Sequence, residues 1–434
     1  MLPKHHPDRR IFVMKRFAAI CFFILLSYLK GTDANAQIAS GFHNPVFSAS
    51  PLAQGNAFVA RADDASAIAF NPAGLTQLTR PQISSGMSFV LPSVEYHGNG
   101  ISEDMDTGIN MIPHSYFASP IIKNKLAAGI GLTAPYGLKG KWDENGFSRF
   151  VITDFDLSII NINPTITFKP LPFLSIGTGL NYYYADSTQE GRIPSFVSGT
   201  PEGFRKLEMD GDGFGYNAGI LCTLTPQHSV GISFRSKADL DLDGELKLSG
   251  LPEAITGSDR FRSDASTTAT LPEMVSFGYA YRHGQTWSIE ADAQWTNWSR
   301  FDALEIGLEP PNPLLGSELE DVRNWHNTWG FALGGEYRVH ETLKVRGGYA
   351  FHESPVPAET FEPSIPQSSR HSLHTGFGYG WGKNLNQWID FAYGIVFYEN
   401  REVNNNVGDA FGTPIDGHYD LITHIIAMNF TYRF

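Results

Sequence analysis

The chain divides into fourteen segments of alternating polarity, and their connections are alternately long and short. A segment with one apolar and one polar face has the period of a half-buried β-strand. Long loops at one end, tight turns at the other and an even strand number are typical of a transmembrane β-barrel. A soluble sandwich has no reason to sort its connections in this way. The expected strands lie near 82–96, 112–122, 125–140, 152–169, 172–188, 213–225, 227–245, 271–283, 286–300, 326–338, 341–353, 370–382, 386–401 and 419–434.

The last strand shows the pattern most clearly. Residues 426–434 place Phe430, Tyr432 and Phe434 on one face and polar side chains such as Thr431 on the other. In a barrel the aromatic face meets lipid, whereas in the alternative, a soluble sandwich, it would face a second sheet. In the barrel interpretation the strand ending at Phe434 is the segment that the barrel-assembly machinery would bind.

The N-terminus has the features of an export signal. Residues 1–36 contain a basic start around Met14, an apolar run over 17–29 and an Ala-Asn-Ala cleavage site at 34–36. The apolar run has the length of a signal core and is too short to cross a bilayer as a helix. We therefore expect residues 1–36 to be a signal peptide, with Met1 or Met14 as the start, and the protein to reach the outer membrane of a Gram-negative cell. A short N-terminal membrane anchor is the alternative.

Composition excludes several classes of function. The net charge of −13 becomes about −17 without the signal, which argues against nucleic acid as a partner. Only Cys222 remains after cleavage, so no intramolecular disulfide can form. We find no motif for a catalytic site, a metal site or a cofactor, and we expect none of them.

Residues 37–80 differ from the strands that follow, because they are rich in small residues and turn formers and do not alternate. About fourteen strands enclose a lumen too wide for barrel side chains to fill. We expect residues 37–80 to form a plug, or hatch, of short helices and turns inside a barrel of residues 81–434. The predicted fold class is all-β: a 14-stranded antiparallel transmembrane β-barrel with an N-terminal hatch.

Several segments, in order along the chain, resemble those of the FadL-type outer-membrane transport proteins. They are residues 60–75, 131–142, 162–186, 211–221, 231–246, 271–281, 291–304 and 349–371. The resemblance implies a monomeric fourteen-stranded barrel in outer-membrane lipid that takes up long-chain fatty acids or aromatic hydrocarbons by diffusion. It also implies that the ligand binds in the lumen and leaves sideways through an opening beside the third strand.

Two short motifs carry the resemblance at specific positions. Asn71, Pro72 and Ala73 match the hatch motif of the family, and the same residues also suit a tight turn that enters a helix. We expect Asp63 and Asp64 nearby to contact basic lumen residues such as Arg149 or Arg235.

The third strand contains Ala134, Pro135, Tyr136 and Gly137, which match the position of the lateral opening. Pro135 lacks the N–H that a ladder needs, so the residues themselves also predict a local defect in this strand. The alternative is an ordinary β-bulge near the rim.

Ligand-binding residues are harder to assign. The resemblance places a carboxylate-binding residue near Arg192, although an ion pair between a lumenal base and Glu290 or Asp292 explains a buried cation equally well. Glu290 and Asp292 themselves alternate with apolar residues and should face inward, because charge on the lipid face is costly. The outer apolar groove of the family would come from two long connections, 189–212 and 246–270, and would contain Ile193, Phe196, Phe204, Leu248, Leu251, Ile255 and Phe261.

The sequence therefore predicts passive uptake of a hydrophobic small molecule, with long-chain fatty acids as the main expected ligands. Aromatic hydrocarbons are the first alternative and a general hydrophilic porin the second. A porin would need no N-terminal plug. An adhesin would leave the plug unexplained, and the His352-Glu353-Ser354 stretch that could suggest a hydrolase matches the transport family instead.

Overall fold

The computed structural model describes residues 40–195, 201–253, 257–312 and 316–434, all within one compact unit, Ala34–Phe434. The expected signal peptide, residues 1–36, lies outside the described residues and remains a prediction.

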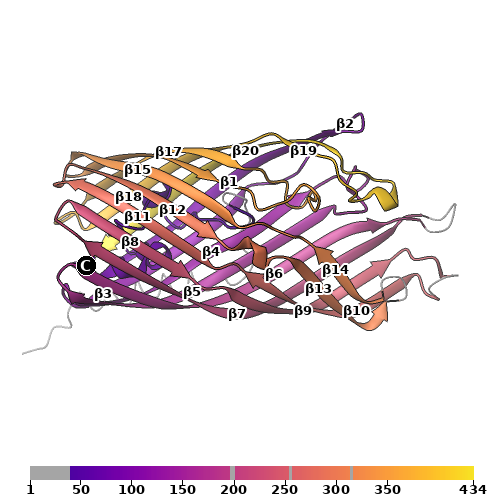
Figure 1. The fold of residues 1–434 in the computed structure, drawn as a ribbon, viewed down its shortest axis with the longest axis horizontal. Helices are drawn as coiled ribbons and strands as arrows, with labels where there is room; N and C mark the ends of the chain where they lie inside the picture. The colour runs from indigo at the N-terminus through magenta and orange to yellow at the C-terminus, as the bar shows by residue number, and fades with distance from the viewer. Residues whose placement is uncertain (1–39, 196–200, 254–256, 313–315) are drawn as a thin grey trace, which may run out of the picture. The chain divides into compact units, whose positions relative to one another are not determined.

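The wall of the protein is one antiparallel sheet closed on itself (Figure 1). Closure comes from the first and last strands, which pair from Gln82↔Arg433 to His97↔His418. The sheet has twenty segments, and six pairs of them are halves of one longer wall strand, so the described residues form fourteen wall strands. The predicted fold class is confirmed.

The segments that make a wall strand alone are β1 (Gln82–Gly98), β4 (Leu126–Lys141), β5 (Asp154–Leu171), β6 (Leu174–Ile193), β7 (Gly203–Thr223), β16 (Leu343–His352), β17 (Arg370–Trp381) and β20 (Gly417–Arg433). The paired segments are β2 (Ile101–Asp104) with β3 (Asn110–Ile122), β8 (His228–Arg235) with β9 (Ala238–Ser249), β10 (Arg260–Leu271) with β11 (Met274–His283), β12 (Trp287–Thr296) with β13 (Ala303–Asn312), β14 (Gly316–Val322) with β15 (Thr328–His340), and β18 (Gln387–Tyr398) with β19 (Arg401–Val403). Two short 3-10 turns, η2 (Trp298–Arg300) and η3 (Asp409–Phe411), lie in the connections.

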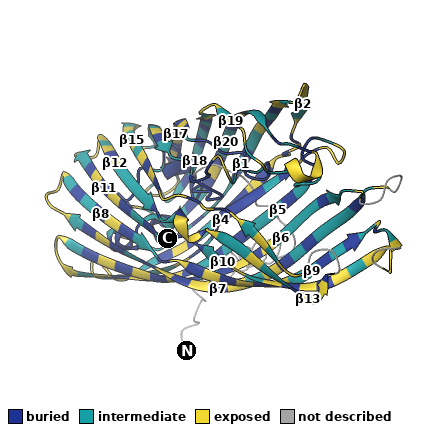
Figure 2. Ribbon diagram, turned by 45° about the vertical axis from the view of Figure 1, so that its right-hand side comes forward, coloured by how far each residue is buried: buried dark blue, intermediate teal, exposed yellow. Residues whose placement is uncertain are grey.

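Burial alternates along most strands, because successive side chains point to opposite faces (Figure 2). On β7, for example, Phe214, Tyr216 and Ile220 are exposed on the outer face, while Asn217 faces the lumen and is buried. This arrangement suits a wall with lipid outside and polar groups inside.

Several expected loops are strands. The connections predicted at 189–212 and 246–270 shrink, because β6 continues to Ile193, β7 begins at Gly203, β9 ends at Ser249 and β10 begins at Arg260. The prediction at 301–325 was wrong in the same way, since most of that connection forms β13 and β14.

These segments were expected to be loops because the polar and apolar faces exchange sides along each long strand. In β9, Asp239, Asp241 and Asp243 are exposed on the outside, and Leu240 and Leu242 are buried inside. These strands therefore continue beyond the lipid layer, where the outer face meets water and the inner face becomes apolar. A rule that assigns apolar residues to the lipid side therefore does not recognise these parts as strands.

Residues 40–80, called the hatch below, contain the short helices α2 (Ala49–Leu52) and α3 (Ala67–Phe70) and the 3-10 helix η1 (Pro72–Gln77). Most of its residues are buried, and η1 contacts the wall strands β3, β4, β5, β6 and β7. None of the helices in the described part of the chain is long and apolar enough to cross a membrane.

Candidate functional site

The Asn71-Pro72-Ala73 motif begins η1 against the inner face of the wall. The Asn71 side chain accepts a hydrogen bond from the N–H of Ala73 at 3.1 Å, which caps η1. Its amide nitrogen donates to the carbonyl oxygens of Val59 at 2.8 Å and of Ile220 at 3.1 Å. One side chain therefore closes the turn, joins two parts of the hatch and attaches both to β7.

Glycines in the wall allow this close approach. A Cβ on Gly177 would lie 2.5 Å from the carbonyl carbon of Pro72, and one on Gly219 would lie 2.1 Å from the side-chain oxygen of Asn71. The hydroxyl of Thr167 donates to the Pro72 carbonyl at 2.6 Å. The hatch motif thus contacts β5, β6 and β7 directly through backbone and side chain.

Two acidic side chains of β12 hold the opposite side of the hatch. The carboxylate of Asp292 accepts the backbone N–H groups of residues 58 and 59 at 2.8 and 3.0 Å. Glu290 accepts those of residues 60 and 61 at 2.5 and 3.1 Å. Both side chains face inward as the alternation predicts. Their partners are four successive N–H groups of the hatch, which no sequence motif indicated.

The ion pairs of the hatch differ from the expected ones. Asp63 lies 3.3 Å from the guanidinium of Arg61 and 3.6 Å from that of Arg282. Of the two bases expected to contact it, Arg149 pairs instead with a glutamate at 3.1 Å, and Arg235 binds neutral groups. The partner from the wall was missed because Arg282 stands at the end of β11, far from both motifs in the sequence.

The ladder between the second and third wall strands is interrupted at the positions that the sequence singled out. Pairing of β3 with β4 ends at Ser115↔Leu132, and an isolated bridge, Asp106↔Lys141, is the next contact between these strands among the described residues. On its other side, β4 changes register against β5 between Thr133 and Tyr136. Every residue over 133–138 is buried, which includes Ala134, Pro135, Tyr136 and Gly137.

The hatch covers this part of β4 from inside. The N–H of Asn44 donates to the carbonyl of Pro135 at 2.7 Å, and the N–H of Gly137 donates to the carbonyl of Phe42 at 3.0 Å. The Asn44 amide nitrogen also donates to the Gly137 carbonyl at 3.1 Å. The first described residues of the hatch therefore form an isolated antiparallel bridge, His43↔Tyr136, beside the interrupted ladder.

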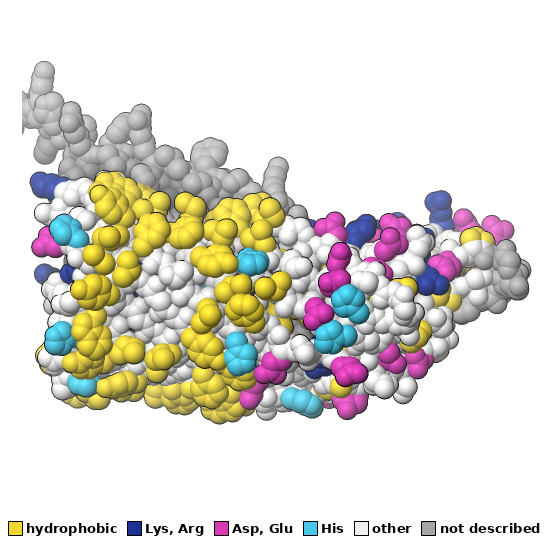
Figure 3. Space-filling model, turned by 90° about the horizontal axis from the view of Figure 1, so that it is seen from above, with side chains coloured by type: hydrophobic (Ala, Val, Ile, Leu, Met, Phe, Trp, Pro, Cys, Tyr) yellow, Lys and Arg dark blue, Asp and Glu magenta, His cyan; other side chains and the backbone are white. Residues whose placement is uncertain are grey.

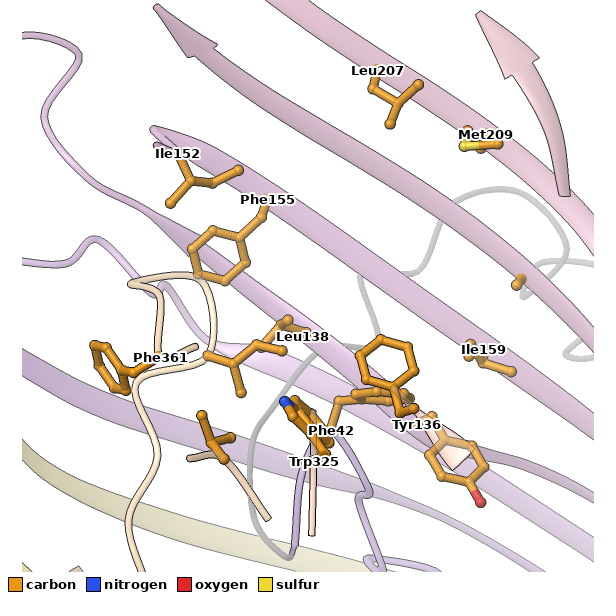
Figure 4. Packing of buried hydrophobic residues seen from close by; sticks show 14 of the residues in the cluster. Phe42, Tyr136, Leu138, Ile152, Phe155, Ile159, Leu207, Met209, Trp325 and Phe361 are labelled. Carbon is orange, nitrogen blue, oxygen red and sulfur yellow. The ribbon is translucent and has the colours of Figure 1, made fainter. Parts of the chain in front are cut away.

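An aromatic cluster surrounds Phe42 (Figure 4). Its ring centroid lies 5.0 Å from that of Trp298, 5.4 Å from Phe301, 5.7 Å from Tyr136 and 5.8 Å from Trp325. Such tilted and edge-to-face contacts stabilise a packed ring beyond the area that they bury. No local sequence pattern marks Phe42, because only the fold brings these rings from four separate segments together.

Phe42 also lines an internal cavity. This upper cavity, of about 920 Å³, lies where the wall strands extend beyond the membrane, and its lining is mostly apolar. Arg323, the one arginine among the described residues that line it, is buried and paired with Asp321 and with Glu362, the latter at 2.6 Å. Apolar side chains lining it include Leu138, Phe155, Leu207, Met209, Leu240 and Leu242.

A lower cavity of about 720 Å³ lies between the hatch and the wall. Arg235 lines it and donates hydrogen bonds at 3.1 Å to Asn181, to the Tyr183 hydroxyl and to the carbonyl of Ala69. Among the described residues no carboxylate pairs with Arg235. His43 lines the same cavity, and burial lowers its pKa to about 3, with nearby Arg235 acting in the same direction.

The remaining residues singled out from sequence lie elsewhere. Arg192 stands near the end of β6, where its guanidinium pairs with Glu144 at 2.7 Å, and it lines neither cavity. Phe196 and Ile255 fall outside the described residues. Ile193, Leu248, Leu251 and Phe261 pack into the apolar cluster around the upper cavity, whereas Phe204 does not belong to it.

A family model for outer membrane transport proteins, the OMPP1/FadL/TodX family, matches residues 32–434. The chain belongs to this family. Its members are transport proteins of the outer membrane, so this barrel resides in the outer membrane of a Gram-negative cell. The family resemblance inferred from the motifs is confirmed.

The chain is also similar to individual members. A long-chain fatty acid transport protein of Escherichia coli O6:H1 is 28% identical over 396 residues, which cover 82% of this chain and 86% of the relative. A solved FadL homologue of Pseudomonas aeruginosa has a TM-score of 0.81 at 20% identity and covers 91% of this chain and 100% of its own. The toluene transporter TodX of Pseudomonas putida has a TM-score of 0.74 at 16% identity and covers 91% and 100%. The two structures establish the shared fold.

Proposed function

We propose that this FadL-family protein is a channel for passive uptake of hydrophobic small molecules, with long-chain fatty acids as its main substrates. One observation carries the proposal: Phe42 lines an apolar cavity of about 920 Å³, and the second cavity, lined by the adjacent His43, contains Arg235 without a carboxylate partner. A long acyl chain needs apolar room, and an ionised carboxylate needs hydrogen-bond donors or a cation. The name of the Escherichia coli relative, a long-chain fatty acid transport protein, supports the same substrate.

The route that we propose ends in the membrane, beside β4. The interrupted ladder between Leu132 and Lys141 spans about eight residues of β4, or about 25 Å of strand. Hatch residues 42–44 cover part of this stretch from inside. Displacing Phe42 from its aromatic cluster would connect the upper cavity with the interrupted wall while the rest of the hatch stays attached.

Several attachments favour a hatch that keeps its place during transport. Glu290 and Asp292 accept four of its N–H groups, and Asn71 binds it to β7. A route through the wall needs none of these contacts to break, whereas a straight route through the lumen needs all of them to break.

Aromatic hydrocarbons are the second candidate. Arg323, which lines the upper cavity, is neutralised by Asp321 and Glu362, so that cavity also suits a ligand without a headgroup. The fold of the TodX toluene transporter is shared as well. A hydrophilic porin fits less well, because the hatch occupies the lumen, and we infer transport rather than catalysis.

The first experiment separates the two ligand classes. Cells that express the full chain are given radiolabelled oleate or toluene, and Arg235→Met is compared with Arg192→Met. We expect Arg235→Met to lower oleate uptake about tenfold, the loss of one strong charge-assisted contact, and to leave toluene uptake unchanged. A purely structural effect of the substitution would reduce both. Loss of oleate uptake in Arg192→Met instead would favour the outer position predicted from the family resemblance.

A second experiment tests the lateral route. Ala134 is buried beside the interrupted ladder, and a tryptophan there would fill the space next to it. Ala128→Trp is the matched control, because Ala128 lies on the same strand with the outward parity of exposed Ile130. We expect uptake to fall in Ala134→Trp and to persist in Ala128→Trp. Equal uptake in both variants, or free passage of sugars and ions through the native chain, would contradict the proposed route.

A further inference from the structure

Two glycines on the outer face of the wall, Gly335 and Gly347, are not required by packing against the rest of the protein. Gly334 and Gly348 face the hatch, where a Cβ on either would come within 2.1 Å of Gln54. Their neighbours Gly335 and Gly347 have the opposite parity and face outward. A Cβ on Gly347 would meet no atom nearer than 3.9 Å, and one on Gly335 would meet only a backbone oxygen at 3.1 Å.

These outward glycines pair directly with each other across β15 and β16. A bare backbone in a strand weakens it, because glycine loses more conformational freedom on folding and offers no side chain for packing. Packing against the hatch explains the inward glycines and leaves the outward pair unexplained. A partner outside the barrel that approaches the backbone closely would account for the pair.

The pair lies at the bottom of a shallow, open apolar groove on the outer wall. Leu333 and Tyr349 stand opposite each other on one side of it, and Tyr337 and Val345 stand opposite each other on the other side. The two ridges are four residues apart along each strand, or about 13 Å between backbone positions. After the width of the side chains is allowed for, the space left suits one extended hydrocarbon chain.

The groove faces the lipid and lies in the periplasmic half of the membrane. Gly335 is five residues from the end of β15, which precedes a short turn, and a strand tilted by about 40° covers about 13 Å of depth in that distance. Figure 3 looks onto the side of the barrel at the top of Figure 1, where β15 and β17 lie. It shows hydrophobic side chains in two belts, with backbone and small side chains between them.

We propose that this groove binds one acyl chain of a phospholipid from the periplasmic leaflet. The walls are aliphatic and aromatic, which suits a hydrocarbon chain. A second barrel would meet the groove with a convex wall, touch Leu333 and Tyr337 on the ridges and leave the glycines uncovered. The groove lies on strands nine to eleven of the fourteen, on the other side of the barrel from β4, so it is separate from the proposed transport route.

The test is native mass spectrometry of the full chain extracted from outer membranes in a mild detergent. We expect the native protein to retain about one phospholipid, and Gly347→Leu to lower this occupancy at least about tenfold, because its side chain fills the groove. Gly347→Ala adds only one methyl group in open space and should give an intermediate loss, so the proposal remains testable if the leucine variant folds poorly. Heat-dependent mobility on a gel monitors folding of each variant.

Ala218→Leu is the matched control. Ala218 lies on β7 between the exposed residues Tyr216 and Ile220, so it faces lipid away from the groove. We expect this variant to retain the phospholipid. The proposal is overturned if folded Gly347→Leu retains as much phospholipid as the native chain. It is also overturned if the native chain retains none, or if the retained mass is a free fatty acid or a second copy of the chain.

Discussion

Removing the Asp292 carboxylate should loosen the hatch by an amount that the structure lets us estimate. One of its oxygens accepts two backbone N–H groups of the hatch, at 2.8 and 3.0 Å, and its other oxygen has no partner among the described residues. A buried N–H group left without an acceptor costs about 1–3 kcal/mol, so Asp292→Ala, which leaves two of them, costs about 2–6 kcal/mol.

We therefore expect a net loss of about 3 kcal/mol of hatch attachment, which raises the population of the released hatch about 100-fold. Trypsin provides the assay, because Arg61 in the same segment is only 4% exposed in the native protein. The variant should be cleaved after Arg61 about 100-fold faster when release is rapid relative to cleavage. Planar-bilayer recordings should show ion conductance that is absent from the native chain.

Asp292→Asn is the conservative control. Its amide oxygen can still accept both N–H groups, so cleavage should stay well below that of Asp292→Ala. A second control, Asp241→Asn, changes an exposed carboxylate outside the barrel and should leave cleavage unchanged. If folded Asp292→Ala is cleaved no faster than the native protein, the two hydrogen bonds do not hold the hatch, and these contacts give no reason for it to stay in place during transport.

Three further predictions concern the hatch. Gly219→Val would force a side chain into the position of the Asn71 amide, so we expect ion leakage in bilayers. In the control Gly307→Ala the added Cβ meets nothing nearer than 3.5 Å, and we expect no leakage. Phe42→Ala removes the centre of the aromatic cluster at a cost of about 3–5 kcal/mol, and initial oleate uptake should rise; unchanged uptake would show that Phe42 is no barrier. Because burial lowers the pKa of His43 to about 3 from 6.5, its contribution to stability is complete above pH 6.5 and is lost progressively between pH 6.5 and 3. Lowering the pH from 7 to 5 should therefore cost about 2 kcal/mol, seen as a lower midpoint of thermal unfolding, and His43→Gln should lack this part of the response.

The sequence predicted those features that depend on local pattern. The strand number follows from period-two alternation, the inward direction of Glu290 from the cost of charge in lipid, and the defect at Pro135 from its missing N–H. It did not predict the partners of these groups. The N–H groups that Glu290 binds lie about 230 residues away in the chain. Phe42 and the rings around it come from four separate segments, so only the closed barrel brings them together.

The reversal of faces along the long strands connects the fold with the proposed function. In the lower part of β7, Asn217 faces the lumen and Ile220 faces lipid, and the polar inner surface there binds the hatch through hydrogen bonds. In the upper part of the same strand, Leu207 and Met209 face inward and Asp210 faces water. Sequence rules for a barrel assume one polarity along a strand, so they assigned the upper part to loops. An apolar interior above the membrane can bind a hydrophobic ligand as it enters. A polar interior at membrane level can hold the hatch through hydrogen bonds. A ligand that enters the upper part therefore meets a polar, occupied lumen below, and the interrupted ladder at β4 is the exit that requires the fewest contacts to break.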